Sequence, residues 1–302
     1  MKKRLGFLTA CLVAALRAEP AAPAVVAAPV ADAPQFIRVE EKGKNTELQT
    51  AVVKFRKDDA SVELVGAIHI ADRKYYEELN ERFEGYDAVL YEGIGGSGKP
   101  AAKGEALPHE RKAEDPPPAA DGGPAPKKKN LDGLHGVYDS AARWLELSYQ
   151  MKEIDYRKPN FVHADLTMEE FSALQTERKE SLVGFMLKTG FQANQKPAVK
   201  EPSSIRLLTS IIKKDKNGLK RELVHTLGAG DDQVAGLTGD NVIIGDRNAK
   251  CLEVLDSEVA LGKQKLCVFY GAAHFPDMEK RLLEDGWTKE GTDWLTAWEI
   301  GS

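Results

Sequence analysis

The sequence has no excess of basic charge, few cysteines and no apolar run long enough to cross a bilayer. Its 302 residues carry a net charge of -5, with a pI of about 5.8. Binding to nucleic acid phosphates requires a basic face, so we expect no nucleic-acid partner. The sequence also lacks a Ser/His/Asp nucleophile elbow and a phosphate-binding glycine loop in its proper context, which excludes those two classes.

The N-terminus has the pattern of an export signal. Met1–Arg4 is basic, Leu5–Leu16 is apolar, and Ala18 ends the stretch with a small residue. We therefore expect residues 1–18 to be an export signal and residues 19–35 a Pro/Ala linker. The apolar run is too short for a permanent span, so the mature chain is expected to have none and to be periplasmic or extracellular.

The three cysteines lead to two further expectations. Leu8–Cys11 resembles a lipobox, so a lipid anchor at Cys11 is an alternative to a cleaved signal. In the mature chain, Cys251 and Cys267 each fall in an apolar element, where a free cysteine behaves as a small hydrophobe. We expect two buried thiols, with a disulfide between them as the alternative in an exported protein.

Composition divides the rest of the chain into a folded domain and an insertion. The chain is 42% hydrophobic, which makes residues 36–302 sufficient for one α/β domain. Residues 95–130 are rich in Gly, Pro, Ala and Lys and offer almost nothing to bury, so they are predicted to be a disordered insertion. Helical periodicity from Leu131 and a capping box at Thr167–Glu170 predict an all-helical middle section.

Residues Val62–Glu92 are predicted to form a strand, a helix and a second strand. An apolar run leads to His69, helical spacing follows over Tyr76–Phe83, and Ala88–Tyr91 is apolar again. A crossover of this length predicts that the two strands are parallel neighbours. Both strands then end at one edge of the sheet, which is where α/β sheets bind ligands.

Residues Leu266–Ile300 repeat this pattern. Gly271–His274 has the same G-x-x-H spacing as Gly66–His69, and a helical stretch and a final apolar run follow it. The sequence thus predicts an α/β fold with a mixed, largely parallel sheet and flanking helices. It would be built from two related strand-GxxH-helix-strand units whose G-x-x-H turns share one rim.

Two imidazoles and a carboxylate on that rim would form a half-open metal site. His69, His274 and Glu92 are suitable ligands for a divalent ion and leave positions for water and substrate. Each also has a structural interpretation, because a histidine after a strand is often hydrogen-bonded and Glu92 could be a surface residue at a loop entrance. The second copy of G-x-x-H favours the metal site.

Four further polar residues have two interpretations each. Arg247 and Asn248 could donate hydrogen bonds to an oxyanion or a carboxylate, or could lie in solvent on a helix surface. His163 and Asp165 could orient a ligand of the site or could simply form the turn that enters the next helix. The sequence alone leaves these alternatives open.

Together these motifs resemble the TraB/PrgY/GumN family, which includes the TIKI metalloproteases and belongs to a wider group with the erythromycin esterase and ChaN-like proteins. The resemblance extends from about Phe36 to the C-terminus, with residues 95–130 and the helical middle poorly covered. It rests on five short motifs: Gly66–His69, Asp87–Glu92, Arg247–Asn248, Gly271–His274 and Gly286–Trp287.

The resemblance implies facing G-x-x-H turns and, for the TIKI branch, a metal-dependent hydrolase that is a peptidase. His69 and His274 would be metal ligands, and Glu92 a ligand or the general base. Arg247 and Asn248 would be catalytic residues that steady the substrate carbonyl or the metal-bound water. The cofactor would be a divalent metal ion such as Mn²⁺, Co²⁺ or Zn²⁺, and the substrate a peptide or a small molecule.

Relatives in the same group also provide an alternative function. Some family members are not known as enzymes, and ChaN-like proteins bind haem. Because a fold does not determine an activity, the alternative is a non-catalytic protein that holds a peptide, haem or metal in the same cleft.

Overall fold

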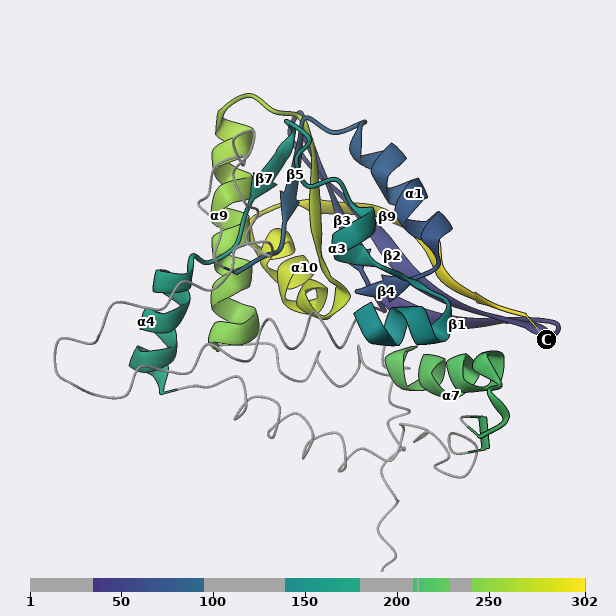
Figure 1. Cartoon of the computed structure of the whole chain (residues 1–302). Helices are drawn as coiled ribbons and strands as arrows, with labels where there is room; N and C mark the ends of the chain where they lie inside the picture. Colours follow the sequence, from purple (N-terminus) through teal and green to yellow (C-terminus); the bar gives the residue numbers. More distant parts are fainter. Residues whose placement is uncertain (1–34, 95–138, 180–208, 211, 229–240, 302) are drawn as a thin grey trace, which may run out of the picture. The chain divides into compact units, whose positions relative to one another are not determined.

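A seven-stranded mixed sheet is the centre of the fold (Figure 1). The computed structural model describes residues 35–94, 139–179, 209–210, 212–228 and 241–301. Within these ranges the strand order is β1-β2-β3-β8-β5-β7, with β9 also paired to β2, and β4 and β6 form a separate two-stranded sheet. The strands are β1 (Ile37–Lys42), β2 (Asn45–Lys57), β3 (Ala60–Ala67), β4 (Ile70–Ala71), β5 (Ala88–Tyr91), β6 (Ser148–Tyr149), β7 (Phe161–His163), β8 (Lys265–Gly271) and β9 (Thr288–Ile300).

The helices with defined bounds are mostly 10–14 residues long. They are α1 (Arg73–Phe83), α3 (Gln150–Glu153), α4 (Met168–Arg178), α7 (Lys216–Gly228), α9 (Arg247–Ala260) and α10 (Phe275–Glu284), together with a π-helical turn η1 (Val242–Asp246) and a 3-10 turn η2 (Ala272–His274). Among the residues described, no helix has the length and apolarity to cross a bilayer.

Several predicted segments fall outside the described residues. They are the export signal with Cys11, the linker up to its last residue, and the insertion at 95–130. All the described residues belong to one compact unit, residues 33–302.

The sheet has an antiparallel half and a parallel half. Strand β2 runs antiparallel to β1, β3 and β9, whereas β3, β8, β5 and β7 are parallel to one another. Since β9 pairs with β2 from Thr46 to Arg56, β1 and β3 must share the other edge of β2. The predicted mixed, largely parallel α/β sheet is confirmed.

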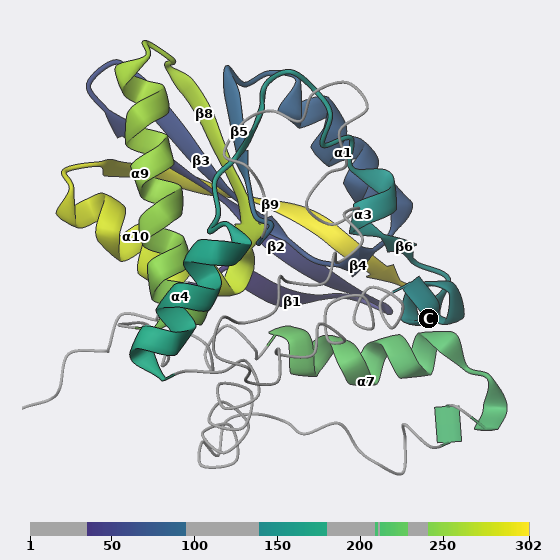
Figure 2. The same cartoon turned by 60° about the vertical axis from the view of Figure 1, so that its left-hand side comes forward.

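Side chains of the central strand β8 alternate between two hydrophobic cores. Leu266, Val268 and Tyr270 pack with residues of α9 and α10, and Cys267 and Phe269 pack with residues of α1. Figures 1 and 2 show α9 and α10 on one face of the sheet and α1 on the other. This alternation at every second residue is what a strand buried on both faces requires.

The two cysteines of the described residues lie on opposite faces of the sheet. Cys251 of α9 belongs to one core and Cys267 of β8 to the other. Both are buried free thiols, as predicted, and burial raises the pKa of each. The alternative of a disulfide between them is therefore wrong for this structure.

The order of the parallel strands differs from the prediction in one respect. Strands β3 and β5 are parallel but are not neighbours, because β8 lies between them and pairs with both. The crossover through α1 therefore leaves space for one strand between β3 and β5, and β8, which comes from a distant part of the sequence, occupies it. The second predicted unit differs in the same way. Its last strand, β9, does not lie beside β8 but pairs with β2, which is separated from β8 by β3.

The middle of the chain is not all-helical, which corrects another prediction. Ser148–Tyr149 pairs with β4, and Phe161–His163 joins the main sheet beside β5. Strands of two and three residues are too short to show a period of two in the sequence. The capping box is confirmed, since Thr167 Oγ1 accepts from the Glu170 amide at 3.1 Å and the Glu170 carboxylate accepts from the Thr167 amide at 2.8 Å.

Candidate functional site

Four parallel strands end at one rim of the sheet. At this edge Ala67 of β3 is opposite Gly271 of β8, and Tyr91 of β5 is opposite both Phe269 and His163. The residues that follow these strand ends include both G-x-x-H histidines and Glu92. The shared rim predicted from the sequence is present, at the carboxyl edge where α/β sheets bind ligands.

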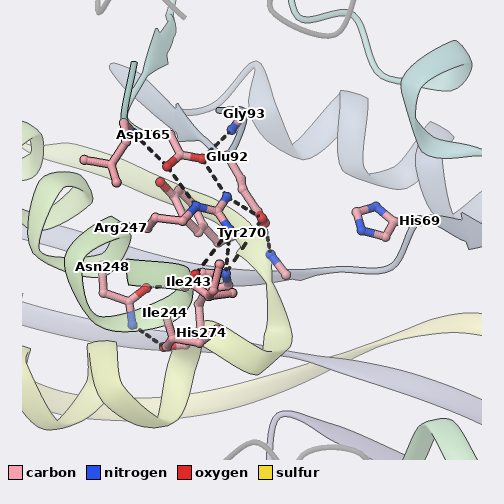
Figure 3. A network of polar contacts seen from close by, with 12 residues as sticks. His69, Glu92, Gly93, Asp165, Ile243, Ile244, Arg247, Asn248, Tyr270 and His274 are labelled. Atoms are coloured by element: carbon pink, nitrogen blue, oxygen red, sulfur yellow. Dashed lines mark hydrogen bonds and ion pairs between the residues drawn. The ribbon is translucent and has the colours of Figure 1, made fainter. Parts of the chain in front are cut away.

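Arg247, the first residue of α9, links two acidic residues on this rim (Figure 3). Its Nη2 lies 2.7 Å from Glu92 Oε1 and 2.6 Å from Asp165 Oδ2, and its Nε lies 3.0 Å from Asp165 Oδ1. The Arg247–Asp165 pair is therefore bidentate, the strongest geometry for a guanidinium and a carboxylate. Arg247 is buried, so the interpretation that it is a solvated surface residue is wrong.

Asp165 is a fully buried partner that fixes the position of this guanidinium. Its side chain is 0% exposed, and its oxygens also accept from the backbone amides of Gly93 at 2.9 Å and Leu166 at 2.7 Å. Every lone pair directed away from Arg247 thus has a main-chain donor. Of the two interpretations given for Asp165, orientation of a site residue is the one that its contacts support.

A π-helical turn delivers Arg247 to the rim. Asn241 Oδ1 accepts from the Ile244 amide at 2.8 Å and starts the turn. Residues 242–246 then continue directly into α9. π-helical turns are rare, occur mostly as single-turn insertions in α-helices, and are frequent at functional sites. Here the turn leads directly into Arg247, whose guanidinium reaches Glu92 and Asp165 at the strand ends.

Glu92 is ionised in this environment. Burial raises the pKa of its carboxyl, but the charge of Arg247 and the Gly271 amide, joined by the two imidazoles at the acidic pH where they are protonated, hold it well below its usual range. The amide of Gly271 donates to Glu92 Oε2 at 2.7 Å. A Cβ at position 271 would lie 3.3 Å from that oxygen, so glycine permits the close approach. The Glu92 side chain is 24% exposed, more than Arg247 or Asp165, and it is the member of the network that reaches the surface.

His274 presents one nitrogen to the same network. Its Nδ1 lies 2.6 Å from Asn248 Oδ1, and its Nε2 lies 3.4 Å from Arg247 Nη1 and 3.7 Å from Glu92 Oε1. Burial lowers the pKa of His274 to about 4, with Glu92 opposing and Arg247 adding to the shift. The ring is therefore neutral at physiological pH.

Asn248 is buried and both ends of its amide are engaged. Besides the contact of its oxygen with His274, its Nδ2 donates to the carbonyl of His274 at 3.1 Å and to Asp277 Oδ2 at 2.8 Å. Asp277 in turn pairs with Arg281 at 2.7 Å. The interpretation of Asn248 as a solvated helix residue is wrong, and its contacts favour holding His274 over touching a substrate.

The turn that carries His69 is anchored on three successive carbonyls. Tyr76 donates to Ile68 O at 2.8 Å, the amide of Gln150 donates to His69 O at 2.9 Å, and Trp298 Nε1 donates to Ile70 O at 2.7 Å. The ring is also held, since His69 Nδ1 lies 3.2 Å from Gln150 Oε1. Figure 3 shows the ring apart from the bonded network, on the side of Glu92 away from Arg247.

The structure therefore brings some predicted site residues together and leaves one at a distance. Glu92, Arg247, Asn248 and His274 form one network, and the His69 ring lies apart from it in Figure 3. Within the described ranges, no three His, Cys, Asp or Glu side chains are already gathered as a metal site. His163, which was considered as a residue that could orient a ligand of the site, contacts the carbonyl of Gly93.

A groove lies beside the buried pair, between α4 and α9. Its volume is about 420 Å³, and its lining includes Leu166, Leu174 and Asp246. Leu166 and Asp246 are each one position from a member of the Arg247–Asp165 pair.

Three site residues could not be identified from the sequence. Gln150 lies in a short helix whose polar residues look solvated, and Asp277 looks like an ordinary acidic residue in the first turn of α10. Gly93 contributes only its backbone. Their roles depend on long-range contacts that leave no local pattern.

The fold and the site together define an α/β protein with a buried Glu-Arg-Asp-His network at the carboxyl edge of its parallel strands. No family model, curated protein or solved structure matches the chain.

Proposed function

We propose that the protein is an exported metal-dependent hydrolase of the TraB/PrgY/GumN type, a peptidase whose metal ligands are His274, Glu92 and His69. The observation that carries this proposal is the facing pair of His274 Nε2 and Glu92 Oε1, 3.7 Å apart. Nitrogen and oxygen ligands about 2.0–2.2 Å from a zinc ion at a tetrahedral angle are roughly 3.4 Å apart. Movement of Glu92 away from Arg247 would therefore let both atoms bind one ion.

The charges of the network also fit a divalent cation. Glu92 and Asp165 are close to the single cation Arg247, and His274 is neutral because burial lowers its pKa to about 4. Two carboxylates and one guanidinium give the cluster a formal net charge of -1. Metal ligands must be deprotonated, and both facing atoms meet that condition at neutral pH.

Completion of the site requires Glu92 to turn from Arg247 towards His69. Glu92 is the most exposed member of the network and lies in Figure 3 between the guanidinium and the His69 ring. Arg247 would keep its bidentate pair with Asp165, so the movement would not leave a buried charge unpaired. The Nη2 group of Arg247, released from Glu92, could then donate to the carbonyl oxygen of a substrate.

A divalent ion at this position would supply Lewis-acid activation of a water molecule and of the scissile carbonyl. The residues of the chain have complementary roles. Glu92, as ligand or general base, accepts the proton of the water. Arg247 holds the carbonyl, His69 and His274 fix the geometry, and the adjacent groove receives a side chain of the peptide.

A non-catalytic protein that binds a peptide, haem or metal in the same cleft is the second candidate. It is favoured by the Arg247–Glu92 pair, which closes the network without an ion. In this alternative the charged residues of the rim would bind a ligand of complementary charge, and the Arg247–Glu92 ion pair would stay intact.

One experiment separates the two functions. The protein is incubated with a mixed peptide library and Mn²⁺, Co²⁺ or Zn²⁺, with and without chelator, and products are identified by mass spectrometry. The proposal predicts cleavage that chelator and Glu92→Gln abolish. Glu47→Gln, which changes a carboxylate on β2 paired with Lys42, is the matched control and should remain active. Tight retention of an intact ligand without turnover with any metal would support the second candidate.

A further inference from the structure

A carboxamide contacts the imidazole of each G-x-x-H turn. Asn248 Oδ1 lies 2.6 Å from Nδ1 of His274, and Gln150 Oε1 lies 3.2 Å from Nδ1 of His69. The two carboxamides come from different elements, α9 and α3, and the two histidines follow different strands. Both rings nevertheless receive the same kind of contact at the same nitrogen.

The proton position on His274 follows from the chemistry of its neighbours. A carboxylate only accepts hydrogen bonds, so the amide nitrogen of Asn248 must face Asp277, 2.8 Å away. The amide oxygen then faces His274 and requires a proton on Nδ1. A guanidinium only donates, so Arg247 Nη1, 3.4 Å from Nε2, requires an electron pair there. Two independent contacts thus assign the same tautomer.

His69 is also contacted by a buried carboxamide. The side chain of Gln150 is buried; its Nε2 donates to the Tyr156 hydroxyl at 2.8 Å, and its Oε1 faces His69 Nδ1. The backbone amide of Gln150 also donates to His69 O at 2.9 Å. One residue therefore fixes both the main chain and the ring of His69.

We infer that Gln150 and Asn248 are matched positioning residues that hold His69 and His274 in the Nδ1–H tautomer, so that both rings offer the Nε2 electron pair to the rim. Metal-ligating histidines commonly have their other ring nitrogen bonded to a carbonyl or carboxylate, which fixes the tautomer. The metal-binding consequence rests on the proposed function. The tautomer itself does not, and it can be measured in the protein without metal.

The test is nitrogen-15 NMR of the imidazoles in the full chain, metal-free and at neutral pH. Ring signals are assigned with His69→Gln and His274→Gln. We expect both rings to show protonated Nδ1 and unprotonated Nε2. Gln150→Met, which has similar length but no acceptor, should move His69 towards the Nε2–H form, whereas Gln150→Glu, which keeps an acceptor, should retain Nδ1–H.

The other ring provides the internal control for folding. Gln150→Met should leave the His274 signals unchanged, which a general loss of structure would not do. The corresponding pair for His274 is Asn248→Leu and Asn248→Asp, read against the His69 signals. Predominant Nε2–H tautomers in the unmodified protein, or an unchanged His69 tautomer in Gln150→Met, would overturn the inference.

Metal affinity distinguishes failure of this inference from failure of the proposed function. Gln150→Met should weaken Zn²⁺ binding about 10–100-fold, the usual effect of removing a residue that orients a ligand, and Gln150→Glu should restore it. If the tautomers are as stated and no metal binds, the positioning role stands and the proposed function is wrong. If Zn²⁺ binds equally well to Gln150→Met although the tautomer of His69 has changed, the positioning role stands, His69 is not a metal ligand and the proposed function is wrong.

Discussion

His274 Nε2 and Glu92 Oε1 face each other across 3.7 Å, although one follows β8 and the other follows β5. The two strands are adjacent and parallel, so their ends deliver an imidazole and a carboxylate to one place. Gly271, at the end of β8, donates to the same carboxylate. The strand order is thus the direct cause of the contact on which the proposed chemistry depends.

Removing Asp165 should destabilise the protein strongly. Asp165→Ala takes away the bidentate partner of the buried Arg247 and leaves its charge poorly compensated, which costs about 3–5 kcal/mol in comparable buried pairs. Urea denaturation measures the change. Glu77→Ala, which removes the exposed i,i+4 partner of Arg73, is the control and should change stability by less than about 1 kcal/mol. Similar losses in both variants would contradict the assigned burial of the pair.

Stability of the metal-free protein should fall as the pH is lowered from about 6.5 to about 4. In this window the unfolded His274 side chain, with its ordinary pKa of 6.5, binds a proton that the folded one, with a pKa of about 4, does not. The contribution of His274 to the free energy of unfolding is complete above the pKa of His274 in the unfolded chain. It is lost as the pH falls to the pKa in the folded chain, and the total loss is at most roughly 3 kcal/mol. Denaturant unfolding across this pH range measures it.

The control for this pH dependence is His274→Gln, which has no group that titrates. Its stability should fall less steeply than that of the unmodified protein between the two pKa values. Glu92 also loses stabilising charge interactions on acidification, but its low pKa puts that loss at more acidic pH. Parallel curves for the two proteins would show that His274 is not held neutral by burial.

Zinc should stabilise the folded chain and chelator should reverse the effect. A ligand that binds only the folded state at one hundred times its Kd contributes about 2.7 kcal/mol. Thermal unfolding with and without Zn²⁺ measures the shift in Tm. His274→Gln should lose most of the shift, and Glu47→Gln should keep it. An equal shift in both variants would mean that zinc binds elsewhere.

The buried cysteines should be unreactive until the protein unfolds. Burial raises the pKa of both Cys251 and Cys267, and the reactive form of a cysteine is the thiolate. Alkylation followed by peptide mass spectrometry should therefore modify neither residue in native buffer and both in denaturant without reductant. Recovery of a Cys251–Cys267 disulfide peptide would contradict their placement on opposite faces of the sheet.

The rim could be predicted from the sequence because its causes are local. A strand, a crossover helix and a strand return the chain in the same direction, which places His69 and Glu92 at one edge wherever the strands lie in the order. The repeated G-x-x-H pattern added His274. The insertion of β8 between β3 and β5 had no such signal, because strand order depends on pairing between distant segments.

The supporting residues were also beyond local patterns. Gln150 and Asp277 matter through contacts with residues far away in the chain, His69 and Asn248. Asp165 was recognised only as one of two alternatives, since the same carboxylate could have served the turn before α4. Burial resolved the choice, and burial of a single polar side chain cannot be deduced from its neighbours in sequence.

The most direct test of the proposed function is X-ray absorption spectroscopy of the zinc-loaded protein. The spectrum reports the number of imidazole rings bound to the ion and their distances. The proposal predicts two imidazoles at about 2.0–2.1 Å together with oxygen ligands, and one imidazole after His69→Gln. Zinc bound through one imidazole or none in the unmodified protein, or no bound zinc at all, would contradict it.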